Sequence, residues 1–366
     1  MNIAIIRLGA YGDIIHALPV LNRLREAYPE AEITWVVDSR YQSLLSIISE
    51  ISGMMVADFK GWSKQGIPGA KKFLGFIREL RKKRFDLVFD LQGLIKSGVV
   101  SRLTGAETRV GFKAEFCRES LNALFNNLKV APPAGNIVNS NLSQLAPFNI
   151  DCSHWRSQIV PDAKSELIVT DYFVRNRYDK GSFILGINIG GGWESKRWPV
   201  ERLAGLCRRV LRETGWKIIL FWAPGDKQLA SVCMDGLRKN FKETAPAPQR
   251  IALAPPTDMI ELAAFFKRLD LLVAVDTGPL HLAAALGIPT VALFGPTDPV
   301  RNGPLGNRNI VVHHRLDCSG CYKRDCPSPR CMESISVDEV YRSCIKLEKK
   351  INPNDSGIIT KQSLSC

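Results

Sequence analysis

The stretch DLLVAVDTGPLHLAAALGIPTVALFGPTDP, residues 270–299, decides the fold of this chain. Its apolar run at 271–275 predicts a buried strand, DTGP predicts a turn, and LHLAAAL predicts a helix that ends at Gly287 and Pro289. TVALFG then predicts a second buried strand. A strand, a helix and another strand in this order are typical of an open α/β sheet, where ligands bind at the carboxyl ends of the strands.

The polar residues of this stretch gather at the end of its first strand. Asp276, Thr277 and Gly278 follow the strand directly, and His281 lies in the first helical turns. Free backbone N–H groups and the helix dipole at this position favour an anion. We therefore expect a phosphorylated ligand here, with the carboxylate facing its sugar hydroxyls. The alternative is an ordinary turn in which Asp276 serves the helix alone.

The start of the chain repeats this arrangement. Residues 3–7 predict a strand, a turn carries Gly9 and Gly12, and Asp13 opens an amphipathic helix. The turn is not the GxGxxG of nicotinamide-binding folds, because its glycines are three residues apart and bulky residues follow. A dinucleotide-dependent oxidoreductase, which would share the architecture, is therefore disfavoured. Asp13 is either a functional carboxylate at the mouth of the strand or a helix cap.

A third strand and turn begin the second half of the chain. FILGINIGGGWESKRWP, residues 183–199, predicts a strand, a phosphate-sized loop that includes Gly191 and Gly192, and then a helix. Lys196 follows this loop, where a mobile ammonium can neutralise a departing phosphate. A surface lysine without a role is the alternative.

Five motifs in order give the chain a family resemblance. They are LGAYGDIIHALPVL (8–21), DLQGLIKSGVVSRL (90–103), FCRESLNALF (116–125), ESKRWP (194–199) and the stretch from Val275 to Pro299. Together they resemble glycosyltransferase family 9, the ADP-heptose:lipopolysaccharide heptosyltransferases. The resemblance implies an α/β protein of GT-B architecture, with two Rossmann-like domains that face each other across a cleft.

The motifs also favour one branch of that family. DLQGLIKS and the pair Arg118-Glu119 are similar to enzymes that add the first heptose, whereas the second-heptose enzymes usually carry Asn-Asp-Ser-Gly at 275–278. In the first branch a proline follows the Arg-Glu pair, and here Ser120 follows it. Transfer of the second heptose is therefore the alternative.

The resemblance implies a reaction and the residues that perform it. Heptose would move from ADP-L-glycero-β-D-manno-heptose to a Kdo–lipid A acceptor with inversion and without a metal cofactor. Asp13 would be the general base, and Lys196 would stabilise the departing ADP. The implied donor-binding residues are Asp276, Thr277, Gly278, His281, Gly191 and Gly192, and the acceptor-binding residues are Gly12, Lys96 and Arg118.

Length and composition agree with two domains. The chain has 366 residues, more than one hydrophobic core normally organises. We expect an acceptor-binding domain at 1–160, a linker at 161–182, a donor-binding domain at 183–351 and a polar tail at 352–366. No apolar run reaches the length of a membrane span and the first strand is not a signal peptide, which predicts a cytoplasmic protein.

The formal net charge of +13 is concentrated in one segment. Residues 59–84 contain nine Lys or Arg against Glu79 alone, with Trp62 and Phe73 among them. Such a segment suits the anionic inner face of the membrane, to which the protein would bind peripherally. The alternative is the solvated face of a helix. Nucleic-acid binding is disfavoured because no nucleic-acid motif accompanies the charge.

Four cysteines crowd a short segment near the end of the chain. Cys318, Cys321, Cys326 and Cys331 occur in CSGCYKRDCPSPRC, a spacing that suits a structural zinc or a disulfide knot. A reducing compartment favours the metal. A basic, metal-stapled nucleic-acid module would also use such a cluster, but it leaves Asp13 and Asp276 without a purpose.

Overall fold

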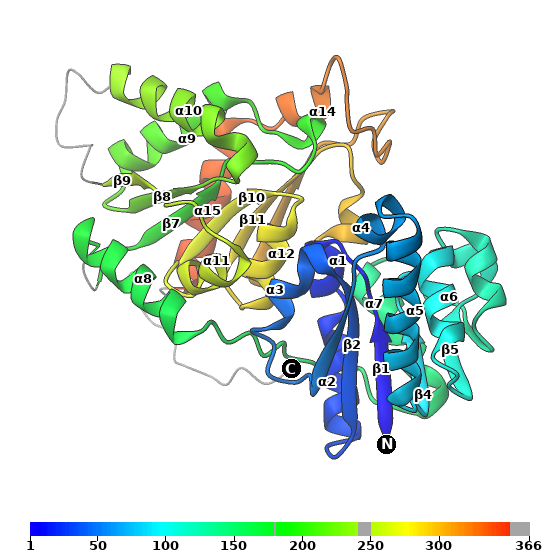
Figure 1. Cartoon of the computed structure of the whole chain (residues 1–366). Helices are drawn as coiled ribbons and strands as arrows, with labels where there is room; N and C mark the ends of the chain where they lie inside the picture. The colour runs from blue at the N-terminus through cyan, green and yellow to red at the C-terminus, as the bar shows by residue number, and fades with distance from the viewer. Residues whose placement is uncertain (179–180, 241–249, 352–366) are drawn as a thin grey trace. The chain divides into compact units, whose positions relative to one another are not determined.

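Two compact units make up the chain, Met1–Val160 and Pro161–Cys366. The structure, a computed structural model, describes residues 1–178, 181–240 and 250–351. The tail expected at 352–366 lies outside these residues. Each unit contains one six-stranded sheet with helices on both of its faces (Figure 1).

The sheet of unit 1 is parallel throughout, in the order β3-β2-β1-β4-β5-β6. Its strands are β1 (Asn2–Ile6), β2 (Glu32–Asp38), β3 (Gly53–Ala57), β4 (Leu87–Asp90), β5 (Thr108–Phe112) and β6 (Leu128–Val130). Its helices are α1 (Tyr11–Ile15), α2 (Leu18–Ala27), α3 (Gln42–Leu45), α4 (Phe59–Lys64), α5 (Ile67–Lys82), α6 (Ile95–Leu103) and α7 (Ile137–Leu142).

Alternate residues of the central strands hold α5 and α6 against one face of this sheet. Ala4 and Ile6 of β1 pack with Phe76 and Leu80 of α5 and with Val100 of α6. Strands that are buried on both faces read as continuous apolar runs, as IAII of β1 does. This burial explains why the strand was recognisable in the sequence.

The sheet of unit 2 is parallel in the order β12-β11-β10-β7-β8-β9. Its strands are β7 (Ile184–Asn188), β8 (Lys217–Phe221), β9 (Ile251–Leu253), β10 (Leu271–Val275), β11 (Thr290–Phe294) and β12 (Asn309–His313). Its helices are α8 (Ala163–Arg175), α9 (Val200–Glu213), α10 (Lys227–Asn240), α11 (Met259–Phe266), α12 (Gly278–Ala285), α13 (Pro299–Asn302), α14 (Arg330–Glu333) and α15 (Val337–Ile351).

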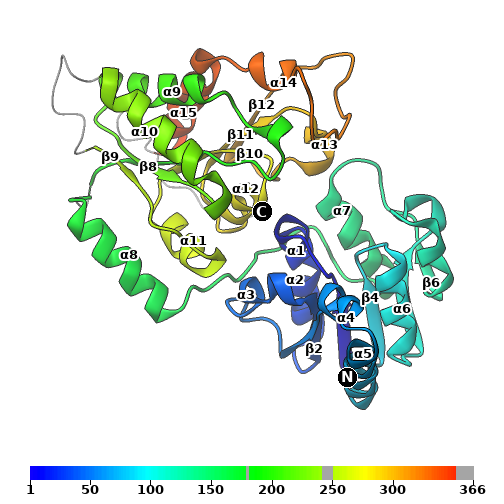
Figure 2. The ribbon, with the colours of Figure 1, turned by 45° about the horizontal axis from the view of Figure 1, so that its top comes forward.

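Helices α9, α10 and α15 cover one face of the second sheet. Figure 2 shows this unit after a 45° turn from the view of Figure 1. Leu206 of α9 and Cys344 of α15 are fully buried there with Val273 of β10. On α8, Phe173 contacts Phe265 of α11 at 6.4 Å between ring centres. The strands are therefore buried by helices that differ widely in sequence position.

The α/β fold class predicted from the sequence is confirmed. Counted in chain order within each unit, both sheets have the strand order 3-2-1-4-5-6 of the Rossmann fold. The strands predicted at 3–7, within 183–199, at 271–275 and at TVALFG correspond to β1, β7, β10 and β11, whereas β12 was not predicted. None of the described helices is both long enough and apolar enough to cross a bilayer.

The strand order fixes where a ligand can bind in each unit. It reverses between β1 and β4 in unit 1, and between β7 and β10 in unit 2. Ligands of open α/β sheets bind outside the carboxyl ends of the strands at such a reversal. Residues that follow these four strands are therefore the candidates for function.

Candidate active site

A buried ion pair joins the two strand ends at the reversal in unit 2. Lys196, in the 3-10 turn η5 (Glu194–Lys196) after β7, places its Nζ 2.9 Å from Oδ2 of Asp276, the residue after β10. The same Nζ donates to the Asp276 carbonyl oxygen at 2.9 Å. His281 Nε2 lies 3.0 Å from the other carboxylate oxygen, Oδ1. Asp276 therefore lies between two basic side chains.

The surroundings of Asp276 keep its carboxylate ionised. Burial by itself raises the pKa of this group, but hydrogen bonding and charge from His281 and Lys196 outweigh it and hold the pKa well below its usual range. Each carboxylate oxygen has a second lone pair, which can accept from a ligand hydroxyl. Lys196 Nζ donates to the carbonyl oxygen and to a carboxylate oxygen of Asp276, and an ammonium group has three N–H donors in all.

The N-terminus of α12 adds backbone donors beside this pair. Thr277 is the residue that precedes the helix, and its hydroxyl donates to the Val275 carbonyl at 3.1 Å. None of the described side chains caps the helix. Thr277 and Gly278 are partly exposed. An uncapped helix start next to a lysine is an anion-binding arrangement.

The glycine loop after β7 is required for close packing. A Cβ on Gly190 would lie 2.1 Å from Oδ2 of Asp226, whose Oδ1 pairs with Arg197 at 2.7 Å. Gly191 is half-buried, and nothing lies within 4 Å of a Cβ built on Gly192. Glycine is therefore required at position 190 by the close packing of Asp226, whereas the space beside Gly192 is open to a ligand.

The loop that carries Lys196 is held by the cysteine-rich segment. Ser195 is 2% exposed, and its hydroxyl donates to the Lys323 carbonyl at 2.6 Å while its N–H donates to the Arg324 carbonyl at 3.2 Å. The Trp193 ring contacts the Lys196 ammonium at 4.3 Å and the Arg324 guanidinium at 5.4 Å. The segment thus positions Lys196.

The cysteines of that segment do not form the knot considered from the sequence. Cys318, Cys321, Cys326 and Cys331 are free thiols, with the first two exposed. No three or more His, Cys, Asp or Glu side chains within 1–178, 181–240 and 250–351 are grouped to hold a metal ion. The zinc interpretation is therefore not supported. Hydrogen bonds from Ser195 to backbone carbonyls connect the segment to the loop after β7.

Asp13 lies at the corresponding edge of unit 1, in α1. Its Oδ1 pairs with Arg7 at 2.9 Å, and its Oδ2 accepts from the Ala10 N–H at 3.2 Å. The Arg7 side chain is 7% exposed and also donates to the Leu91 carbonyl after β4. Arg7 therefore bridges the two strand ends at the reversal and orients a carboxylate that is 39% exposed. This geometry fits a functional carboxylate, because Asp13 is partly exposed, and it also fits a helix cap, because Asp13 accepts a hydrogen bond at the helix start.

The turn before Asp13 depends on glycine. Gly9 has a φ of +150°, and a Cβ there would lie 2.2 Å from the Tyr41 ring. Gly12 is partly exposed within α1. The turn therefore lets the Tyr41 ring approach the backbone closely.

Basic side chains gather around the carboxyl ends of β2 and β4. Arg40 pairs with the buried Asp38 at 2.8 Å. Burial raises the pKa of Asp38, but its bonds to Arg40 and the nearby charge of Lys96 lower it below the usual value. Lys96 is exposed in the first turn of α6. Arg118 is exposed too, with its backbone N 3.4 Å from a Cβ built on Gly93, which follows β4.

A buried polar network holds the Arg118 segment in place. Asp90, at the end of β4, accepts from Asn122 Nδ2 at 2.6 Å and from Ser97 Oγ at 3.1 Å. Burial raises the pKa of Asp90 in spite of these hydrogen bonds. Glu119 accepts from the Ile95 N–H at 2.6 Å, at the start of α6. The motifs at 90–103 and 116–125 are therefore two halves of one packed element.

We expect Asn122→Ala to lower the free energy of unfolding by about 1–3 kcal/mol, because it leaves the buried Asp90 carboxylate without its shortest hydrogen bond. Urea unfolding measures this change. The neighbouring Asn127 is exposed, so Asn127→Ala should cost less. Equal losses in the two variants would contradict a special role for the Asp90 network.

The structure brings the predicted residues together in two groups. Lys196, Asp276, Thr277, Gly278, His281 and the loop glycines lie at the edge of the second sheet, and Gly12, Asp13, Lys96 and Arg118 lie at the edge of the first. Sequence reasoning missed Arg7, Trp193, Ser195 and Arg324. Arg7 could have been found, because it is a basic residue at the end of the first strand. The roles of Trp193, Ser195 and Arg324 depend on tertiary contacts that the sequence does not show.

Two Rossmann-type sheets, each with charged groups at its carboxyl edge, are the fold found in GT-B glycosyltransferases. The chain belongs to glycosyltransferase family 9, the heptosyltransferase family, whose model matches residues 73–331. It is therefore an enzyme, a glycosyltransferase. This membership decides against the oxidoreductase and nucleic-acid-binding alternatives.

Individual relatives are similar along nearly the whole chain. Lipopolysaccharide heptosyltransferase 1 of Campylobacter coli is 28% identical over 353 residues, which cover 93% of this chain and 97% of the relative. The enzyme of the same name from Pseudomonas aeruginosa is 25% identical, and the alignment covers 96% of this chain and 95% of the relative.

Solved structures share the fold. The family 9 glycosyltransferase of Veillonella parvula aligns with a TM-score of 0.80 at 24% identity, covering 95% of this chain and 97% of that one. Escherichia coli heptosyltransferase WaaC, solved with ADP, aligns with a TM-score of 0.73 at 22% identity and covers 95% and 100%.

Proposed function

We propose that this enzyme transfers heptose from ADP-L-glycero-β-D-manno-heptose to the first heptose position of a Kdo–lipid A acceptor. The observation that carries the proposal is the Lys196–Asp276 pair beside the uncapped start of α12. The names of the similar enzymes from Campylobacter coli and Pseudomonas aeruginosa support the heptose and the lipopolysaccharide.

Unit 2 is the proposed donor domain. Lys196 and the backbone N–H groups of Thr277 and Gly278 bind the diphosphate, which lies along Gly191 and the open space beside Gly192. Asp276 accepts from heptose hydroxyls, while His281 holds the carboxylate in position. As the glycosidic bond breaks, negative charge grows on the departing ADP. Donors already aimed at that charge stabilise the transition state without reorganisation.

Unit 1 is the proposed acceptor domain. Asp13, oriented by Arg7, takes the proton from the acceptor hydroxyl as that oxygen attacks the anomeric carbon. Attack opposite the leaving ADP inverts the β donor to an α product. Gly12, which is partly exposed beside the base, contacts the acceptor, and Lys96 and Arg118 bind its acidic groups. Protein cations serve the leaving group, so the reaction needs no metal.

A transfer assay with two acceptors tests this proposal. We expect heptose transfer from ADP-heptose to Kdo–lipid A that lacks heptose, an unchanged rate in excess EDTA, and an α linkage by NMR. An acceptor that already carries the first heptose should react poorly. Preference for that second acceptor would establish the alternative, second-heptose transfer. Absence of transfer to both would overturn the proposed function.

A further inference from the structure

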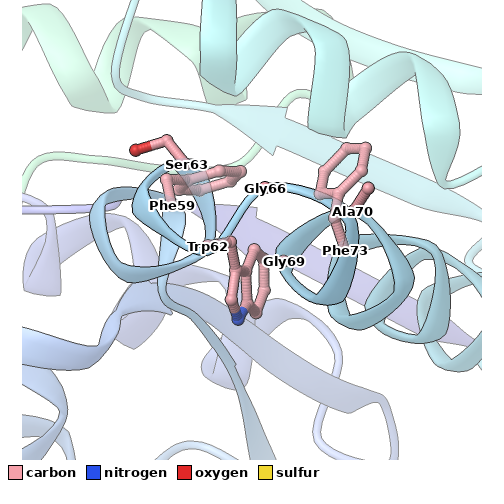
Figure 3. A pocket seen from close by; sticks show the side chains of 7 residues that line it. All are labelled: Phe59, Trp62, Ser63, Gly66, Gly69, Ala70 and Phe73. Carbon is pink, nitrogen blue, oxygen red and sulfur yellow. The ribbon is translucent and has the colours of Figure 1, made fainter.

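The hairpin formed by α4 and α5 in unit 1 contains an apolar pocket that the proposed reaction does not use. Gly66, with a φ of +56°, makes the turn between the two helices. The pocket has a volume of about 280 Å³ and is lined by Phe59, Trp62, Ser63, Gly66, Gly69, Ala70 and Phe73 (Figure 3). Aromatic rings from both helices form its walls.

The walls of this pocket are fixed by packing. The Trp62 ring contacts Phe59, Phe73 and Phe76 at centre distances of 5.7, 6.1 and 5.6 Å. A Cβ on Gly69 would lie 1.9 Å from the Trp62 carbonyl oxygen, so the two helices touch through their backbones. Phe59, Trp62 and Phe73 also pack against the core of unit 1. The pocket is thus a built feature of this unit.

Beside the pocket, α5 exposes an outward stripe in which apolar and basic side chains alternate. Ile67 and Leu74 are 75% and 63% exposed, and Lys71 and Arg78 are exposed between and beyond them. Positions 67, 71, 74 and 78 repeat at the spacing of one helix face. The opposite face carries the buried Phe76, Ile77 and Leu80. The helix therefore presents apolar groups in two directions.

The charged side chains within α4 and the first half of α5 are all lysines, and Asp58 precedes α4 as its cap. Lys60, Lys64, Lys71 and Lys72 are exposed on α4 and on the first half of α5. Lys82, at the far end of α5, already pairs with Glu79 at 2.7 Å. Exposed apolar side chains with lysines around them are typical of helices that lie in the headgroup region of an anionic membrane.

We propose that the α4–α5 hairpin docks on an anionic phospholipid bilayer, with the end of one acyl chain in the pocket. Ile67 and Leu74 then enter the interface, and the lysines contact headgroup phosphates. A volume of about 280 Å³ is just below the range of roughly 300–1,000 Å³ for small-molecule sites, which suits a chain end rather than a whole nucleotide. The inference deepens the proposed function, because a lipid-linked acceptor resides in such a bilayer.

Binding to phosphatidylglycerol vesicles without donor or acceptor tests the charge. We expect strong binding at low salt that is absent for phosphatidylcholine vesicles. The double variant Lys64→Gln/Lys71→Gln should bind about thirtyfold more weakly. Lys129→Gln/Lys164→Gln makes the same charge change at exposed lysines elsewhere and should have little effect. Equal losses in the two double variants would overturn a localised docking surface.

Filling the pocket tests the acyl chain. Ala70→Leu should weaken binding to phosphatidylglycerol vesicles about tenfold. Phospholipid brominated near the chain end should quench tryptophan fluorescence in the native protein, and less in Trp62→Phe. Ala163→Leu, at an exposed position of α8, is the matched control and should bind normally. Unchanged binding and quenching in Ala70→Leu would overturn the pocket assignment.

The same variants separate this inference from the proposed function. Ala70→Leu should transfer heptose to a water-soluble acceptor fragment at the native rate. Loss of vesicle binding with transfer intact supports the inference. The native protein could transfer heptose without binding phosphatidylglycerol vesicles, or bind them only when acceptor is present. Either result overturns the inference about the hairpin and does not contradict the proposed function. Vesicle binding without any transfer overturns the function alone.

Discussion

Asp13→Ala is expected to lower the turnover of heptose transfer by about two to four orders of magnitude while ADP-heptose binding stays nearly unchanged. The carboxylate is the proposed base for the acceptor hydroxyl, and the donor groups belong to the other unit. Steady-state kinetics with calorimetric donor binding measure both quantities.

Three controls accompany this measurement. Asp13→Ala leaves the buried Arg7 without its ionic partner, so the variant's unfolding must be measured alongside its kinetics. Asp13→Asn preserves the side-chain shape and should lose as much turnover as the alanine variant. Glu30→Ala removes an exposed carboxylate from unit 1 and should remain fully active. A folded Asp13→Ala enzyme with native turnover would exclude Asp13 as the base.

Lys196→Ala is expected to reduce turnover by about a hundredfold or more, because the lysine acts mainly on charge that develops as ADP departs. The low pKa of Asp276 keeps its carboxylate ionised at neutral pH, so the variant also leaves that buried charge with His281 as its basic partner. Rapid-quench kinetics at saturating donor isolate the chemical step.

The neighbouring Lys323 supplies the control, since its side chain is exposed and its backbone carbonyl contacts Ser195. Lys323→Ala should therefore turn over normally. Asp276→Ala should differ from Lys196→Ala by weakening donor binding as a whole. The leaving-group role of Lys196 fails if its variant only raises the donor Michaelis constant and keeps native turnover.

The fold could be predicted because strands that are buried on both faces consist of consecutive apolar residues. IAII of β1 and LLVAV of β10 are shielded on both faces, so their composition alone marks them. β12, with three partly exposed residues and one exposed residue of five, lacks that signal and was missed. The turns after the strands were also recognisable, since Gly9 and Gly190 are required by the close approach of Tyr41 and Asp226.

The partners of the site residues could not be predicted, because they come from distant parts of the chain. Lys196 and Asp276 are 80 residues apart and meet only because β7 and β10 are neighbours in the sheet. Asp90 meets Asn122 in the same way in unit 1. The prediction from the cysteine spacing was not supported. The spacing suggested metal ligation, whereas the segment contacts the rest of unit 2 through the carbonyls of Lys323 and Arg324, which accept hydrogen bonds from Ser195.

A crystal structure of the protein with bound ADP would locate the donor site directly. We expect the diphosphate at the carboxyl edge of the second sheet, within hydrogen-bond distance of Lys196 Nζ and of the N–H groups that begin α12. Lys196→Ala crystals should show a displaced or weakly occupied diphosphate. ADP bound instead among Arg7, Arg40 and Arg118 of unit 1 would overturn the proposed donor site, because the donor and acceptor domains would then be reversed.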